Sequence, residues 1–230
     1  LTDQNGCKSV ASQTINVVKD VVVSAVASKQ EICEGDVLSL TASGTVGTYS
    51  WSNGTTGNTI AVSPKSSTTY SVTVSTGIGC TATSDVSIQV NPKPKPIIEI
   101  TPSKAGNSYC VGDTIQMLAS GGSTYNWSNG AISPVIQVKP LVGTKYSVLV
   151  ADSKGCTDTI SSFIQINPLP ALSVKAVASE ICLGGKASIS AVGAGSFQWS
   201  NGEVSNTIMP HPSFNTTYSV TLTDLNGCKS

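Results

Sequence analysis

The residues best suited to chemistry in this chain of 230 residues are its seven cysteines. They occur in two settings, a "first Cys" two residues before a Gly and a "second Cys" directly after a Gly. The first set is Cys33, Cys110 and Cys182, and the second set is Cys7, Cys80, Cys156 and Cys228. No two cysteines are close in sequence and the single histidine is His211, so the spacing of a zinc site is missing. Cysteines at regular positions in small units instead indicate disulfides and an oxidising compartment.

The cysteines belong to a repeat that runs through the whole chain. The motif Trp-Ser-Asn-Gly begins at Trp51, Trp127 and Trp199, and the first nine residues (LTDQNGCKS) match the last nine (LTDLNGCKS) at eight positions. Such self-similarity is typical of a tandem array, so we expect this chain to be a window of a longer one. The expected parts are the final strand of a preceding repeat (1–18), repeat 1 (19–91), repeat 2 (92–168) and repeat 3 (169–230), which lacks its final strand.

Apolar residues alternate with polar ones in every repeat, which predicts strands rather than helices. In repeat 1 this pattern covers 38–42, 49–51, 60–62, 70–74 and 88–90, and it recurs in the other repeats. Six or seven short strands in about 75 residues, separated by turns, predict an all-β fold built from small β-sandwiches. The expected core aromatic residues are Trp51, Trp127, Trp199, Tyr70, Tyr146 and Tyr218. The alternative for the three tryptophans is an exposed platform for sugars.

Composition restricts the classes of function. Charged residues make up 11% of the chain, with 13 basic and 13 acidic residues, so there is no basic surface for nucleic acid or anionic lipid. No apolar run reaches the length of a membrane span. Asp36 and Asp113 recur after the first Cys but give way to Gly185 in repeat 3, which indicates turn residues. We therefore expect no enzyme activity, no catalytic or metal-binding residues, no cofactor, no nucleic-acid partner and no direct insertion into a membrane.

The order of motifs carries a resemblance to a known class of repeat. C-x-G, W-S-N-G, T-x-Y-S-V, G-C and V-N-P follow one another throughout the chain. This series resembles the immunoglobulin-like (PKD-like) tandem repeats of very large Bacteroidota cell-surface proteins, such as gliding-motility adhesins exported by the type IX system. The resemblance implies an array of immunoglobulin-like sandwiches, extracellular display, and a structural role as the stalk or filament shaft of an adhesin. It implies neighbouring repeats as partners, with glycans or other surface proteins as further candidates.

Two other functions stay open on the sequence. One is a carbohydrate- or surface-binding module, and the other is a spacer region in a secreted polysaccharide-degrading enzyme. Asp113-Thr114-Ile115 and Asp158-Thr159-Ile160 also resemble the short O-glycosylation motif of Bacteroidota, which makes Thr114 and Thr159 candidate glycoprotein sites. The alternative is that these threonines simply occupy strands.

The disulfide connectivity has two candidate patterns. In an immunoglobulin-like topology the first Cys lies before the second strand and the second Cys lies in the last hairpin, at opposite ends of the domain. Strands of five or six residues span about 17–20 Å, whereas a disulfide needs Cα atoms within about 7 Å. We therefore prefer bridges between repeats, leaving Cys7, Cys80 and Cys182 for partners outside the window. The preferred pairs are Cys33–Cys156 and Cys110–Cys228, and the alternative pairs within repeats are Cys33–Cys80, Cys110–Cys156 and Cys182–Cys228.

Overall fold

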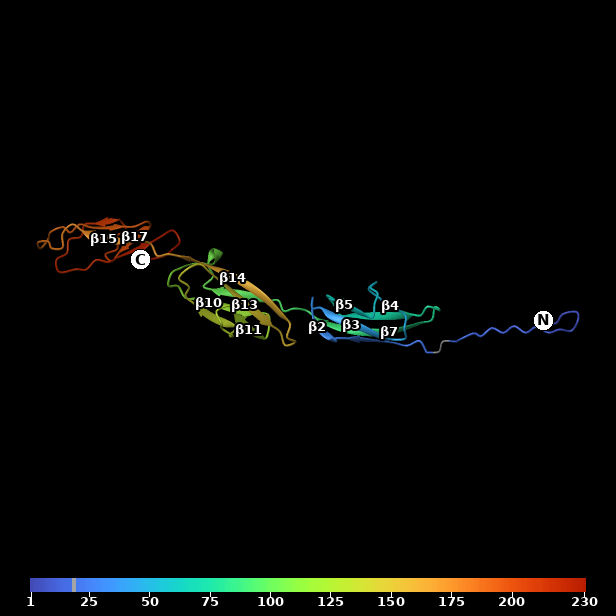
Figure 1. Cartoon of the computed structure of the whole chain (residues 1–230). Helices are drawn as coiled ribbons and strands as arrows, with labels where there is room; N and C mark the ends of the chain where they lie inside the picture. Colours follow the sequence, from blue (N-terminus) through green and yellow to red (C-terminus); the bar gives the residue numbers. More distant parts are fainter. Residues whose placement is uncertain (18–19) are drawn as a thin grey trace. The chain divides into compact units, whose positions relative to one another are not determined.

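The computed structural model describes residues 1–17 and 20–230 and consists almost entirely of strands and loops (Figure 1). It divides into two compact units, Leu1–Lys93 and Pro94–Ser230. The first unit contains repeat 1, and the second contains repeats 2 and 3. Among the described residues, the only helical segment is the short 3-10 turn η1 (Ala105–Asn107).

Repeat 1 is a sandwich of two sheets, as the alternating pattern predicts. The chain passes between the sheets several times, in the manner of immunoglobulin-like domains. One sheet has the order β1-β3-β5, with β1 (Val23–Ala27), β3 (Leu38–Gly44) and β5 (Thr59–Val62). The other has the order β2-β7-β6-β4, with β2 (Glu31–Cys33), β7 (Thr81–Asn91), β6 (Thr68–Ser75) and β4 (Thr48–Trp51). All pairs are antiparallel except β2 and β7, which run parallel.

Repeat 2 has the same topology. Its first sheet contains β8 (Ile97–Thr101), β10 (Ile115–Ser120) and β12 (Val135–Val138) in the order β12-β10-β8. Its second sheet has the order β11-β13-β14-β9, with β11 (Thr124–Trp127), β13 (Thr144–Ala151), β14 (Thr157–Asn167) and β9 (Ser108–Cys110). β9 is again parallel to the final strand, β14. The fold is thus an all-β array of immunoglobulin-like sandwiches.

The tryptophans lie inside the sandwiches. Trp51, Trp127 and Trp199 are 2–3% exposed. Each indole N–H donates a hydrogen bond to the backbone carbonyl six residues further along the chain, at 3.0, 2.9 and 2.8 Å respectively. Because a buried Trp N–H needs an acceptor, this contact fixes the path of the chain after the Asn-Gly turn. Burial of these three rings leaves no tryptophan platform for sugars.

The three tyrosines expected in the core show how complete the core of each repeat is. Tyr70 and Tyr146 are buried, at 8% and 9% exposure, and burial raises the pKa of Tyr146. Tyr218, their counterpart in repeat 3, is only partly buried against its core. The difference reflects the smaller core of repeat 3.

Repeat 3 has the same two sheets in reduced form. They are β15-β16-β18, with β15 (Ser173–Ala176), β16 (Ile189–Val192) and β18 (Thr207–Ile208), and the pair β17 (Ser196–Trp199) and β19 (Val220–Thr223). Its buried cluster has three residues, whereas that of repeat 2 has twelve. The final strand, β7 or β14 in the other repeats, has no counterpart in the described part of repeat 3. The segment 180–182, equivalent to β2 and β9, accordingly forms no strand, because its parallel partner is missing.

The assignment of residues 1–18 to the final strand of a preceding repeat stays a prediction, because the described residues contain no such repeat for them to pair with. Residues 1–17 contain one isolated bridge, Thr2↔Lys8, and no strand. Ile15 and Val17, which have the same spacing from the Gly-Cys motif as Ile88 and Val90 of β7, are 78% and 77% exposed. A strand forms only when its backbone groups find a neighbouring strand, and no described strand pairs with this segment. Residue 18, and residue 19 at the start of repeat 1, lie outside the described residues.

Replacing Met117 by Ala tests the core of repeat 2. Met117 is fully buried in β10, while its neighbour Gln116 points to solvent. We expect Met117→Ala to lower the free energy of unfolding of repeat 2 by about 2–5 kcal/mol, and Gln116→Ala to change it by less than about 0.5 kcal/mol. Urea-dependent hydrogen exchange of β10 and β13 measures both values. Equal effects of the two substitutions would contradict the assigned face of β10.

Candidate functional site

The two cysteines of one repeat lie at opposite ends of its longest strand. In repeat 1, Cys33 ends β2 and pairs with Asn91, the last residue of β7, whereas Cys80 directly precedes Thr81, the first residue of β7. Eleven residues of strand separate these two ends by about 35 Å at 3.3 Å per residue. A disulfide allows about 7 Å between Cα atoms. A bridge within one repeat is therefore geometrically impossible in this fold.

The structure contains a disulfide that joins two successive repeats. Cys110, at the end of β9 in repeat 2, is bonded to Cys228, in the last hairpin of repeat 3, with 5.5 Å between the Cα atoms and a sequence separation of 118 residues. Both residues are buried, at 8% and 1% exposure. The bridge therefore closes a second connection between repeats 2 and 3, in addition to the linker at 167–170.

This disulfide is one of the two pairs preferred from the sequence. The alternative pairs Cys110–Cys156 and Cys182–Cys228 do not form, because Cys110 and Cys228 are bonded to each other. Cys33–Cys80 does not form either, since Cys80 is free, as are Cys7 and Cys182. The physical reason is the strand length described above. Cys33 and Cys156 each take part in a disulfide, and the pairing of these two residues with each other stays a prediction.

The hairpin that carries Cys228 is held by one aspartate. Asp224 Oδ1 accepts hydrogen bonds from the backbone N–H groups of Asn226 and Cys228, both at 2.8 Å. The backbone N–H of Asp224 in turn donates to the Cys228 carbonyl at 3.0 Å. Asp152 makes the same bonds to Lys154 and Cys156 at 2.9 Å. The carboxylate thus satisfies the N–H groups of a tight turn and holds the backbone of the cysteine in place.

The motif D-x-x-G-C is the sequence signal for this hairpin. It occurs at Asp3, Asp152 and Asp224, always four residues before the second Cys. Repeat 1 has Thr76 instead, whose hydroxyl accepts from the Cys80 N–H at 3.2 Å. The recurrence of a short oxygen-bearing side chain at this position indicates an Asx-type turn.

The turn after Cys110 has its own anchor, Asp113. Its Oδ2 accepts a hydrogen bond from the Cys110 N–H at 3.1 Å and from Lys104 Nζ at 2.8 Å. The Lys104 hydrogen bond, followed by the Cys110 N–H, lowers the pKa of Asp113 below its ordinary value. The interpretation of Asp113 as a turn residue is therefore right, and Lys104 is a partner that sequence spacing did not reveal.

Tyr109 closes the same corner from the inside of repeat 2. Its ring is fully buried, its hydroxyl donates to the Pro102 carbonyl at 2.6 Å, and Lys104 Nζ lies 5.0 Å from the ring centroid. Burial is the main reason that the pKa of Tyr109 is raised. The residue before the bridging Cys110 is thus anchored in the core, so the disulfide is attached to a rigid part of the repeat.

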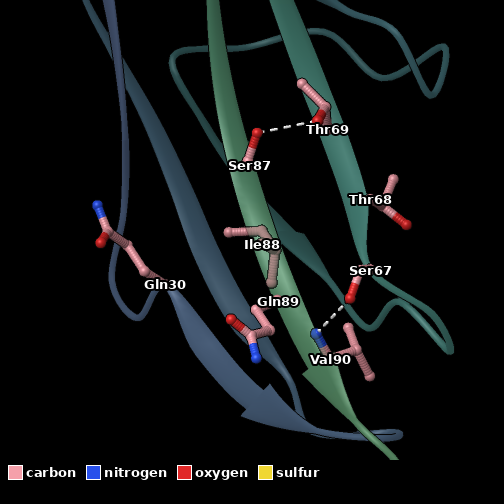
Figure 2. Close-up of a pocket in the computed structure, with 8 residues that line it drawn as sticks. All are labelled: Gln30, Ser67, Thr68, Thr69, Ser87, Ile88, Gln89 and Val90. Carbon is pink, nitrogen blue, oxygen red and sulfur yellow. Dashed lines mark hydrogen bonds between the residues drawn. The ribbon is translucent and has the colours of Figure 1, made fainter.

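Other candidate features offer less chemistry. Thr114 and Thr159 are exposed, as a glycosylation site requires. Figure 2 shows a shallow hollow in repeat 1 lined by hydroxyl, amide and aliphatic side chains. In it the hydroxyls of Thr69 and Ser87 are 2.9 Å apart, and Ser67 Oγ accepts a hydrogen bond from the Val90 N–H at 3.0 Å. Its lining contains no charged side chain.

Two further observations concern the described ranges 1–17 and 20–230. No three His, Cys, Asp or Glu side chains in them are placed so that they could hold a metal ion together. In the same ranges, no helix has the length and apolar character needed to cross a membrane.

Comparisons with known proteins give similarity to solved structures only. No protein-family model matches the chain, and no curated protein matches it. One similar structure is from a 1.5-MDa bacterial ice-binding adhesin, with 16% identity, 92% of this chain and 95% of that chain covered, and a TM-score of 0.31. A second is a Ca2+-stabilized adhesin with which an Antarctic bacterium binds ice, with 15% identity, coverage of 92% and 72%, and a TM-score of 0.38. A third is the N-terminal eight Ig domains of Down Syndrome Cell Adhesion Molecule, with 14% identity, coverage of 91% and 34%, and a TM-score of 0.36.

Replacing Asp224 by Ala tests the hairpin. The change removes the acceptor of two backbone N–H groups, so we expect faster hydrogen exchange at Asn226 and Cys228, corresponding to a loss of about 1–3 kcal/mol of local stability. Asn226→Ala alters the exposed turn but keeps those bonds, and serves as the control. If both variants exchange like the parent chain, Asp224 does not hold the hairpin.

The Asp113 carboxylate predicts a pH dependence. Because its pKa is lowered in the fold, its contribution to stability is fully present above the unfolded pKa of about 3.9 and is lost as the pH falls through the lower folded pKa. Asp113 is 36% exposed, so solvent screens the contribution and the effect is modest. We expect that in Asp113→Asn the urea concentration at the unfolding midpoint falls less steeply as the pH is lowered. Asp158→Asn, outside this turn, is expected to leave this pH dependence unchanged. The same pH dependence in the parent chain and both variants would contradict this role of Asp113.

Proposed function

We propose that the chain is a load-bearing segment of an exported cell-surface adhesin, a stalk or filament shaft that holds a distal binding region away from the cell. The observation that carries the proposal is the Cys110–Cys228 disulfide. A bridge within a repeat would stabilise that repeat alone. A bridge between repeats restricts how two successive units move, which is the property that a shaft requires.

The joint between repeats 2 and 3 has two covalent connections and one hydrogen bond that supports the linker. The first is the short linker Asn167-Pro168-Leu169-Pro170, whose two prolines restrict the backbone. The second is the disulfide. The third is a hydrogen bond of 2.7 Å from the Ser230 hydroxyl to the Pro170 carbonyl, which attaches the last hairpin to the linker. Together these contacts oppose bending and twisting at the joint.

The disulfide also changes the path of a pulling force. Tension that enters repeat 2 near β8 reaches Cys110 and passes directly through the sulfur atoms to Cys228. The residues between the two cysteines then lie outside the loaded path, and their unfolding adds no length. A shaft built in this way keeps its length under load.

The cellular location of the chain and its bacterial origin are proposed on separate grounds. Disulfides persist in oxidising environments, which supports an extracellular location on the cell surface. The finer assignment, to Bacteroidota surface proteins of the type IX and gliding-motility kind, rests on the motif resemblance alone. Glycosylation at Thr114 and Thr159 remains part of this proposal, and their exposure supports it.

A carbohydrate-binding function lacks a recurring surface. The three tryptophans are buried, and the exposed Phe163 and Phe214 have Ser87 and Ser66 at the equivalent positions of repeat 1. An aromatic strip repeated on one face is therefore missing from the described residues. This observation favours the structural function over the binding module.

Single-molecule force spectroscopy tests the load path. The full chain is pulled between a clickable residue at the exposed position Ile97 and a tag after Ser230. We expect the oxidised chain to show almost no extension from residues 111–227, and mild reduction or Cys228→Ser to release up to about 400 Å, at 3.3–3.6 Å per residue. Cys182→Ser makes the same chemical change at a free cysteine and is expected to release nothing. Full extension of the oxidised parent chain would refute the shaft mechanism.

A further inference from the structure

The motif W-S-N-G places an exposed Asn-Gly pair in the same turn of all three repeats. The pairs are Asn53-Gly54, Asn129-Gly130 and Asn201-Gly202. Each Gly N–H donates to the carbonyl of the Trp three residues earlier, at 2.9, 2.8 and 2.9 Å, and each Gly has a φ between 84° and 90°. This geometry is that of a type I turn followed by a left-handed Gly. The chain therefore contains one turn in three copies, with the same backbone hydrogen bond in each.

An Asn that precedes Gly can lose its side-chain amide without an enzyme. The Gly nitrogen gives its proton to solvent base and attacks the Asn Cγ, the side-chain nitrogen takes a proton from solvent and leaves as ammonia, and a five-membered succinimide forms. Water then opens this ring to aspartate or isoaspartate. The net reaction consumes one water and releases one ammonia, and nothing is oxidised or reduced. In all three turns no atom lies within 4 Å of the place where a Cβ on the Gly would be, so access to its nitrogen is open.

The negative charge that develops in this reaction lies on the Asn Oδ1, because the attack converts the amide carbon into a tetrahedral centre. Hydrogen-bond donors directed at such an oxygen stabilise the charge. In all three turns Oδ1 accepts a bond of 3.2 Å from the backbone N–H two residues later, which belongs to Thr55, Ala131 and Glu203 respectively. The backbone donor is thus the same in the three copies, and the side chain at this position differs.

These three side chains have different effects on the Asn amide. The Thr55 hydroxyl donates a second hydrogen bond to Asn53 Oδ1, at 2.6 Å. Ala131 has no polar side-chain atom and adds nothing. Glu203 Oε1 accepts a bond from Asn201 Nδ2 at 2.7 Å, so a carboxylate lies beside the oxygen that becomes negative and repels the developing charge.

We propose that Asn53 is a self-modifying site, which the Thr55 hydroxyl makes more reactive than the same Asn of the other two turns. The co-reactant is water, and the products are aspartate and isoaspartate. Both add a negative charge to the turn, and isoaspartate also adds one carbon to its main chain. The same loop continues to Gly57, whose carbonyl accepts the Trp51 indole N–H at 3.0 Å. The modification therefore takes place next to a contact that holds the core of repeat 1.

Ageing of the oxidised full chain at mildly alkaline pH tests the proposal. The aged chain is reduced and cut with trypsin, and fragment mass spectra assign each amide loss to one Asn. The three Asn are on different peptides, which end at Lys65, Lys139 and Lys229. We expect Asn53 to react about fivefold to tenfold faster than Asn129, less than the roughly 100-fold effect of a donor in a closed enzyme site because solvent also reaches this turn. Asn201 is expected to be the slowest of the three. Equal rates at Asn53 and Asn129, or a faster Asn201, would overturn the proposal.

Exchange of side chains between the turns isolates the hydroxyl. Thr55→Ala gives repeat 1 the side chain that repeat 2 has in the same turn, so the fold is expected to persist and Asn53 to react at the rate of Asn129. Thr55→Ser keeps the hydroxyl and is the matched control, with the parent rate expected. Ala131→Thr is the reciprocal change and is expected to accelerate Asn129. An unchanged rate at Asn53 in Thr55→Ala would overturn the role of the hydroxyl.

The same measurement in urea separates the folded turn from the local sequence. Each of the three Asn precedes Gly, and unfolding removes the hydrogen bonds that distinguish them. We therefore expect the rates at Asn53, Asn129 and Asn201 to converge in the unfolded chain. A ratio in urea as large as that in the native chain would assign the effect to neighbouring residues alone and would overturn the proposal that the turn creates the site.

Discussion

The length of the final strand is the constraint on which the rest of this structure depends. β7 and β14 each have 11 residues, with the second Cys before their first residue and the first Cys beside their last. The two cysteines of a repeat are therefore held apart by a rigid strand, about five times further than a disulfide can reach. In repeat 2 the first Cys is accordingly bonded to a cysteine of repeat 3. The final strand thus completes its own sandwich and also prevents a disulfide within it, so that the cysteines can bond only to those of other repeats.

The final strand is equally important for the sandwich itself. It supplies core residues such as Ile88 and Ile164, and it is the parallel partner of the short strands β2 and β9. Repeat 3 shows the consequence of its absence from the described residues, with a buried cluster of three residues and no short parallel strand. Stability in such an array is shared between neighbours, and the Cys110–Cys228 bridge joins repeat 2 to repeat 3 in this way.

Much of this architecture could be predicted from the sequence because it follows from local patterns. Alternation at Leu38, Leu40 and Ala42 places those side chains on the buried face of β3, and the aromatic-x-Trp motif places Trp51 in the core. The strand ends follow from the same alternation, so the separation of the two cysteines within a repeat could be predicted as well. These features depend on periodicity, which a single sequence contains.

The remaining features depend on partners distant in the chain or on exact loop paths. Ile15 and Val17 have the spacing of a buried strand, yet they are exposed because spacing does not provide a neighbouring strand. The bond between Lys104 and Asp113 depends on the course of the chain around η1, which no motif encodes. Asp224 is a different case, since D-x-x-G-C recurs and the hydrogen bonds to the turn could have been inferred from it.

Peptide mapping without reduction is the most direct test of the claim that successive repeats are covalently joined. Free thiols are first blocked, and trypsin then separates the relevant cysteines, because Lys154, Lys175 and Lys186 place Cys156, Cys182 and Cys228 on different peptides. The account predicts that the Cys228 peptide is linked to the Cys110 peptide and that Cys182 is blocked. A Cys228 peptide linked to Cys182, or a Cys110 peptide linked to Cys156, would contradict it.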